Sequence, residues 1–110
     1  MGISKTSNYT ARQLELAKIA KALSHPARIA IVQFLLKKKT CYCGDIVSEL
    51  PIVQSTVSQH LKELKAAGLI KGTIAGTSTC YCIDEKNWKS SQQLIAALFD
   101  KIPAVKSTCC

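Results

Sequence analysis

The sequence contains no long hydrophobic run and no motif of a common catalytic or cofactor site. No apolar stretch approaches the roughly 20 residues that a membrane-spanning helix needs, and the N-terminal residues MGISKTSNYTARQ lack the apolar segment of a secretion signal. A C-x-x-C redox motif, a catalytic triad and a cofactor-binding loop are also absent. We therefore expect a cytoplasmic protein with no membrane segment and no required cofactor, which is neither an enzyme nor a thiol-based carrier.

Acidic residues are few, whereas basic residues and cysteines are numerous. The 110 residues include 15 Lys and Arg against 7 Asp and Glu, which gives a net charge of +8. This excess favours a nucleic-acid partner, because each neutralised phosphate releases condensed counterions; a merely solvated basic surface would have the same composition. The chain also has six cysteines, which without a secretion signal indicate metal or redox chemistry before a disulfide scaffold.

Hydrophobic periodicity and capping residues predict a small, mainly α-helical domain with one β-hairpin. The predicted N-caps are Thr10, Ser24 and Asp84, and Thr10 with Gln13 fits a capping box. The predicted elements are helices over residues 10–23, 24–39, 44–50 and 54–67, two strands around the turn AGTS, and a helix that follows residue 84 and ends at residue 103. This order matches a winged helix-turn-helix over residues 10–102, with flexible ends at residues 1–9 and 103–110.

The helix QSTVSQHLKELKA would be the recognition helix of such a domain, with the hairpin as the wing. Its side chains include short hydrogen-bonding groups that reach phosphates and base edges, and lysines that attract phosphates. The candidate DNA-contacting residues are Gln54, Ser55, Thr56, Ser58, Gln59, His60, Lys62 and Lys65. A polar helix that merely faces solvent would show the same residues.

Three stretches, ALSHPARIAIVQFL, CYCGDIVSELPIVQSTVSQHLKELKAAGLI and GTSTCYCID, resemble the ArsR/SmtB family of metalloregulatory winged-helix repressors over about residues 11–100. The resemblance implies a dimeric repressor that leaves double-stranded operator DNA when it binds an inducer. A homodimer joined through the first and last helices is also expected because two amphipathic helices in so small a domain leave apolar surface uncovered.

The segment CYCGDI resembles the arsenic-sensing C-x-C-D box of that family, with Gly44 inserted before the aspartate. Soft thiolates at Cys41 and Cys43 would select As(III), with Sb(III) or Cd(II) as further candidates. A helix start and the preceding lysines would favour the thiolate form. Because Ile46 stands where some members have a third cysteine, we expect Cys109 and Cys110 in the tail to complete the site.

The second CYC tripeptide has three interpretations. If Tyr81 packs inward, Cys80 and Cys82 point outward from a wing strand about 7 Å apart. They are then incidental exposed thiols, ligands of a second ion site, or a redox pair. A repressor with a redox or persulfide switch is accordingly the alternative to an ion-induced one.

Overall fold

The computed structural model describes residues 8–38, 40–75, 78–100 and 103. Its elements are α1 (Ala11–Ala22), α2 (Pro26–Leu36), β1 (Tyr42–Cys43), the 3-10 helix η2 (Ile46–Ser48), α3 (Gln54–Ala66), β2 (Ile70–Ala75), β3 (Ser78–Ile83) and α4 (Glu85–Phe99). These helices and the β2–β3 wing confirm the predicted winged helix-turn-helix class. Most of the two predicted flexible ends, including Cys109 and Cys110, lies outside the described residues.

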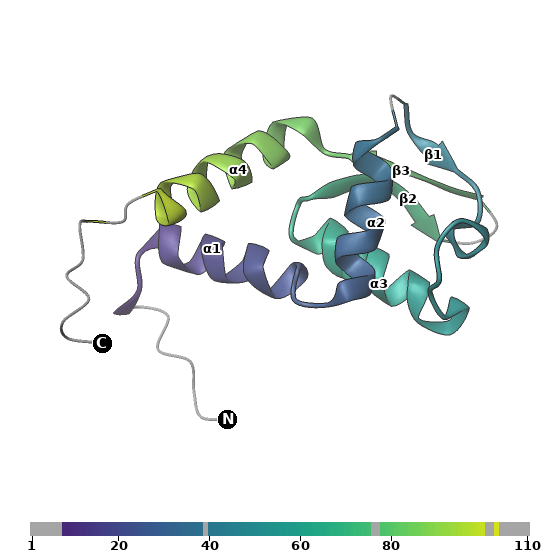
Figure 1. Cartoon of the computed structure of the whole chain (residues 1–110), viewed down its shortest axis with the longest axis horizontal. Coiled ribbons are helices and arrows are strands. Elements are labelled where there is room, and N and C mark those ends of the chain that lie inside the picture. Colours follow the sequence, from purple (N-terminus) through teal and green to yellow (C-terminus); the bar gives the residue numbers. More distant parts are fainter. Residues whose placement is uncertain (1–7, 39, 76–77, 101–102, 104–110) are drawn as a thin grey trace.

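The elements divide between two ends of the molecule, as Figure 1 shows. Helices α1 and α4 pack together at one end, while α2 and α3 pack beside the small sheet at the other. The hydrophobic core includes buried side chains from α1, α2, α3 and the sheet. Its largest members are Ile19, Ile31, Ile46, Leu64, Leu69, Ile70 and Tyr81.

Local capping explains where three of the helices begin. The predicted capping box is confirmed: the Gln13 backbone donates to Thr10 Oγ1 (3.1 Å) and the Thr10 backbone donates to Gln13 Oε1 (2.9 Å). Asp84 caps α4 as predicted. The prediction for α2 was wrong by one residue, because His25 Nδ1 accepts from the Ala27 backbone (3.0 Å).

The prediction of a third α-helix over residues 44–50 was wrong, because this segment contains only the single 3-10 turn η2, and the short strand β1 comes directly before it. Gly44 has a φ of +150°, a value that L side chains rarely adopt and that an α-helix does not contain. Strand β1 pairs antiparallel with β3 and completes a three-stranded sheet of order β1-β3-β2. The chain therefore passes from a sheet strand through Gly44 into η2, and no α-helix forms over residues 44–50.

Among the described residues, no single helix is long and apolar enough to cross a membrane. Helices α1 and α2 pass that test only as a pair, and they are bent by 93° relative to one another. Both contribute buried side chains to the core.

Candidate nucleic-acid interface and cysteine cluster

Helix α3 has one buried and one exposed face. Val57, Leu61 and Leu64 are buried at helical spacing. The other face is polar and basic, and its exposed members are Ser55, Thr56, Ser58, Gln59, Lys62 and Lys65. Gln54 begins the helix. Six of the eight residues predicted to contact DNA thus lie together on an exposed helical surface.

His60 stands apart from this surface because it is only 7% exposed. Arg28 Nε donates to His60 Nδ1 (3.2 Å), and the His25 ring centroid lies 4.5 Å from that of His60. Burial, followed by the nearby His25 and Arg28, lowers the pKa of His60 below 6.5. His60 therefore joins α3 to the start of α2. Its place in the 57-60-61-64 pattern is the sequence signal for this buried position.

Lys65 and Thr56 have partners within the fold. Lys65 Nζ donates to the backbone carbonyl of Gly72 in β2 (2.7 Å), which ties α3 to the wing. Thr56 Oγ1 donates to the Val53 carbonyl in the turn that precedes α3 (2.9 Å). Lys65 thus links α3 to another element and Thr56 closes the turn at the start of the helix, whereas Ser55, Ser58 and Lys62 are exposed side chains on the same element.

The two CYC tripeptides lie side by side in the sheet. Tyr42 is opposite Tyr81 and Cys43 is opposite Cys80 in the β1–β3 register. Disulfides join Cys41 to Cys82 and Cys43 to Cys80, with Cα–Cα distances of 4.4 and 4.1 Å. We call Cys41, Cys43, Cys80 and Cys82 the cysteine cluster. It brings together two cysteine pairs that the sequence analysis treated as separate sites.

The tyrosines on the opposite side of these strands face the core. Tyr81 is 1% exposed, and its ring packs against that of Tyr42 with centroids 6.0 Å apart. Burial raises the pKa of Tyr81 to about 12, with smaller contributions from Tyr42 and Asp45. Because side chains alternate along a strand, inward tyrosines place all four cysteines on the outward face.

The cluster changes the expected chemistry of Cys41 and Cys43. Neither is at the start of a helix, so a helix N-terminus does not favour their thiolate forms. Lys38, the nearest described lysine in the preceding segment, has its Nζ 4.7 Å from the Phe34 ring centroid and 5.6 Å from that of Tyr42. In this structure, where both cysteine pairs are disulfides, no group of three or more His, Cys, Asp or Glu among the described residues could hold a metal ion.

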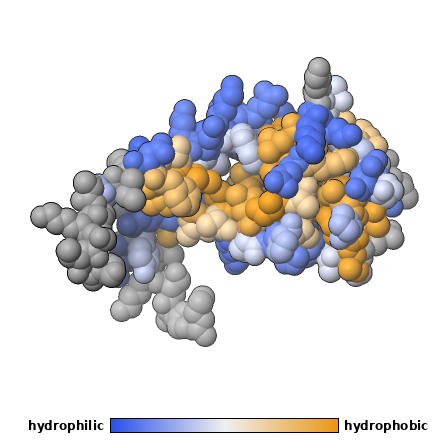
Figure 2. Space-filling view, viewed as in Figure 1, coloured by the Kyte–Doolittle hydropathy of each residue, from blue (hydrophilic) through white to orange (hydrophobic). Residues whose placement is uncertain are grey.

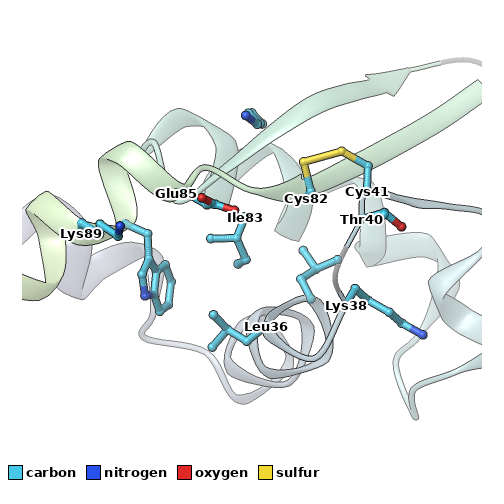
Figure 3. A pocket seen from close by; sticks show the side chains of 11 residues that line it. Leu36, Lys38, Thr40, Cys41, Cys82, Ile83, Glu85 and Lys89 are labelled. Carbon is cyan, nitrogen blue, oxygen red and sulfur yellow. A yellow bond between two sulfur atoms is a disulfide. The ribbon is translucent and has the colours of Figure 1, made fainter.

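A pocket of about 370 Å³ lies beside the Cys41–Cys82 disulfide. Figure 3 shows the two sulfur atoms at one side of this pocket, with Leu36 and Ile83 along its length and Lys89 at the far side. Trp88 also contributes to the wall. The disulfide is therefore reached from a surface pocket and is not enclosed in the core.

Comparisons with known proteins agree with this architecture. The family model of bacterial regulatory proteins of the arsR family matches residues 25–71, which include α2 and α3. The chain is 42% identical over 64 residues to the HTH-type transcriptional repressor SmtB of Mycobacterium tuberculosis, covering 58% of this chain and 47% of that protein. It is 36% identical over 82 residues to the HTH-type transcriptional regulator MJ1325 of Methanocaldococcus jannaschii, covering 74% of this chain and 92% of that protein.

Solved structures of other proteins share this fold. An ArsR-like transcriptional regulator from Rhodococcus sp. RHA1 has the same fold, with a TM-score of 0.60 and 23% identity over 84% of this chain and 89% of that one. The cadmium metal-sensor CMTR from Mycobacterium tuberculosis gives a TM-score of 0.52 and 27% identity over 84% of this chain and 98% of that one. The names of these relatives describe them as transcriptional regulators or repressors, and this chain spans about half the length of the SmtB relative. The chain belongs to the ArsR family of helix-turn-helix transcriptional regulators.

Proposed function

We propose that this protein is a cytoplasmic, homodimeric transcriptional repressor that leaves its operator when a soft ion binds its cysteine thiolates. The observation that carries the DNA-binding part is the exposed face of α3, where short polar side chains and Lys62 stand beside a β-hairpin wing. In this fold the recognition helix enters the major groove, and the wing approaches the backbone.

Within that face the side chains have different expected roles. Ser58 and Gln59 carry groups that hydrogen-bond base edges, whereas Lys62 attracts phosphates without reading sequence. Lys65 contributes its charge from a position fixed by its hydrogen bond to Gly72. Replacing Gln59 should therefore reduce specificity, and replacing Lys62 should weaken binding to every sequence.

The test is retardation of DNA from the protein's own promoter, compared with random DNA of equal length. Gln59→Ala should weaken promoter binding by about 1–3 kcal/mol, the worth of a good base contact, while leaving random binding nearly unchanged. Gln33→Ala is the matched control, because Gln33 is an exposed glutamine on α2. Equal losses for both variants, or no preference for promoter DNA in the wild type, would refute the proposed recognition face.

Exposed apolar side chains support a homodimer joined through α1 and α4. Leu14 on α1 is 40% exposed, and Leu98 and Phe99 at the end of α4 are 58% and 74% exposed. Figure 2 shows hydrophobic surface between these two helices. A second copy that covers this surface would remove apolar area from water. Light scattering should give twice the chain mass at micromolar concentration, and Phe99→Asp should shift it toward the monomer.

The thiols support control by a soft ion, because thiolates select thiophilic ions over hard ones. As(III) is the proposed inducer, with Sb(III) and Cd(II) as further candidates; the related CMTR is described as a cadmium metal-sensor. Cys41 and Cys43 are the first proposed ligands, and Cys109 and Cys110 remain candidates that lie outside the described residues. Arsenite should release the reduced protein from promoter DNA, and Cys41→Ser with Cys43→Ser should abolish release without weakening DNA binding.

The two disulfides favour a second candidate, a repressor switched by oxidation. With hydrogen peroxide as oxidant, each pair of thiols would form one disulfide and lose two electrons and two protons, while the hydrogen peroxide is reduced to two molecules of water. Mild peroxide should then release DNA, and a thiol reductant should restore binding. Retardation that is the same before and after oxidation would exclude this candidate and leave ion control in place.

A further inference from the structure

We infer that the cysteine cluster is a single soft-ion site in which β3 supplies the thiolate that completes the coordination of As(III) by Cys41 and Cys43. This inference rests on the proposed function, because it concerns the ion that the repressor senses. It assigns Cys80 and Cys82 to the same site as the C-x-C segment and makes the tail cysteines unnecessary for coordination.

The register of the sheet places the four sulfur atoms in one small area. Facing cysteines are separated by Cα–Cα distances of 4.4 and 4.1 Å across the two strands. Cysteines two apart along one strand lie on the same face, about 7 Å from each other. Cys41 and Cys43 are exposed, while Cys80 and Cys82 are half-buried. Three thiols can therefore approach one ion from the same side of the sheet.

Soft ions differ in the coordination geometry that they prefer, and this difference decides which of them fits the cysteine cluster. As(III) bound to three thiolates is a trigonal pyramid, with all three sulfurs on one side and a lone pair on the other. Zn(II) prefers a tetrahedron, which needs ligands distributed around it. Four cysteines on one face of a sheet provide the first arrangement more readily than the second. The site should consequently prefer As(III), and Sb(III) by the same chemistry, over Zn(II).

Reduction must precede binding, because a disulfide sulfur is not a thiolate ligand. A thiol reductant supplies two electrons and two protons to each disulfide, which yields four thiols, and the reductant is oxidised to its own disulfide. Arsenous acid then reacts with three of these thiols; three As–S bonds form, three As–O bonds break, and three molecules of water leave. The pocket beside the Cys41–Cys82 pair gives both reagents access to the sulfurs.

The test is binding of arsenite to the reduced full-length protein, followed by X-ray absorption and by a count of free thiols. The wild type should show three As–S bonds per chain and lose three free thiols. The double variant Cys109→Ser, Cys110→Ser is the matched control and should keep three As–S bonds, with affinity within about twofold of the wild type. The double variant Cys80→Ser, Cys82→Ser should fall to two As–S bonds and lose at least about 100-fold in affinity, since even second-shell changes cost 10–100-fold.

The single variants Cys80→Ser and Cys82→Ser provide a second test if the double variant does not fold. Each leaves three thiols in the cluster, so each should retain three As–S bonds. The inference is overturned if the tail variant loses an As–S bond while the double variant at positions 80 and 82 keeps three. It is equally overturned if that double variant binds arsenite as tightly as the wild type.

Retardation of promoter DNA separates this inference from the proposed function. If arsenite forms three As–S bonds that depend on Cys80 and Cys82 but DNA is not released, the site stands and ion-induced release is refuted. If arsenite releases the double variant at wild-type concentrations, release stands and the assignment to β3 is refuted. DNA affinity without arsenite, measured for each variant, reports whether the fold is intact.

Discussion

Tyr81→Phe should stabilise the protein, although it removes a polar group from a buried tyrosine. Tyr81 is 1% exposed, and no hydrogen-bond partner for its hydroxyl is found in the part of the chain that the structure describes. A buried hydroxyl without a partner costs about 1–3 kcal/mol of desolvation. Phenylalanine retains the ring packing against Tyr42 and removes that cost. We therefore expect a gain of about 1 kcal/mol, which is a rise in Tm of about 4–8 °C for a domain near this size.

Tyr42→Phe is the matched control, because Tyr42 lies opposite Tyr81 in the sheet but its hydroxyl donates to the Asp45 carbonyl (3.4 Å). Urea unfolding of both variants under reducing conditions gives the two free energies. The control should be neutral or slightly destabilised. If Tyr81→Phe lowers the free energy of unfolding, its hydroxyl is hydrogen-bonded in the fold and the reasoning fails.

Alkaline pH provides an independent measurement of the same environment. The pKa of Tyr81 is raised from 10.0 to about 12 in the fold, so the folded state favours the protonated form. Its contribution to the free energy of unfolding is complete below pH 10 and is lost as the pH rises from 10 toward 12. Tyr81→Phe should lack this part of the alkaline loss, whereas Tyr42→Phe should retain it.

Three further predictions concern other parts of the fold. Gly72→Ala should destabilise the wing by at least about 1–3 kcal/mol in urea unfolding, because the φ of Gly72 is +127° and an added Cβ would come within 2.7 Å of Tyr81 Cα. Burial lowers the pKa of His60 and so favours its neutral form in the fold; the contribution of His60 to stability is therefore present above pH 6.5 and is lost as the pH falls. In urea unfolding at several pH values, His60→Gln should reduce this loss of stability at acidic pH. If some six phosphates are neutralised, promoter affinity should fall about 1,000-fold between about 50 and 200 mM salt, and Lys62→Ala should reduce the slope against log salt by about one; a retardation assay at several salt concentrations measures both.

The helices and the wing could be predicted from the sequence because their signals are local. Thr10 and Gln13 form the capping box that their spacing indicates, and Asp84 begins α4. The segment after residue 40 could not be predicted in this way. A short amphipathic pattern ending before Pro51 resembles a helix, but the residues just before it pair with a strand nearly 40 residues later, and only a single 3-10 turn follows Gly44. Local propensity cannot report such long-range pairing.

The cysteine cluster was missed for the same reason, although the sequence contains a signal for it. CYC reads the same in both directions, so two antiparallel copies in register place cysteine opposite cysteine and tyrosine opposite tyrosine. Their dissimilar flanking residues concealed this relation. His60 was predicted to contact DNA because it is polar. Its position three residues after Val57 and four before Leu64 instead places it on the buried face of α3.

Two structural routes join the cysteine cluster to the recognition helix. Strand β1 leads through Gly44 and Asp45 into η2, which packs against α3. Strand β3 pairs with β2, which packs against α3 and accepts the Lys65 hydrogen bond at Gly72. An ion held between β1 and β3 would therefore act on both supports of α3 at once. A hundredfold change in operator affinity requires a coupling of about 3 kcal/mol. Since a hydrogen bond contributes about 0.5–1.5 kcal/mol net, a shift that breaks a few contacts of the Lys65–Gly72 kind is enough to release the DNA.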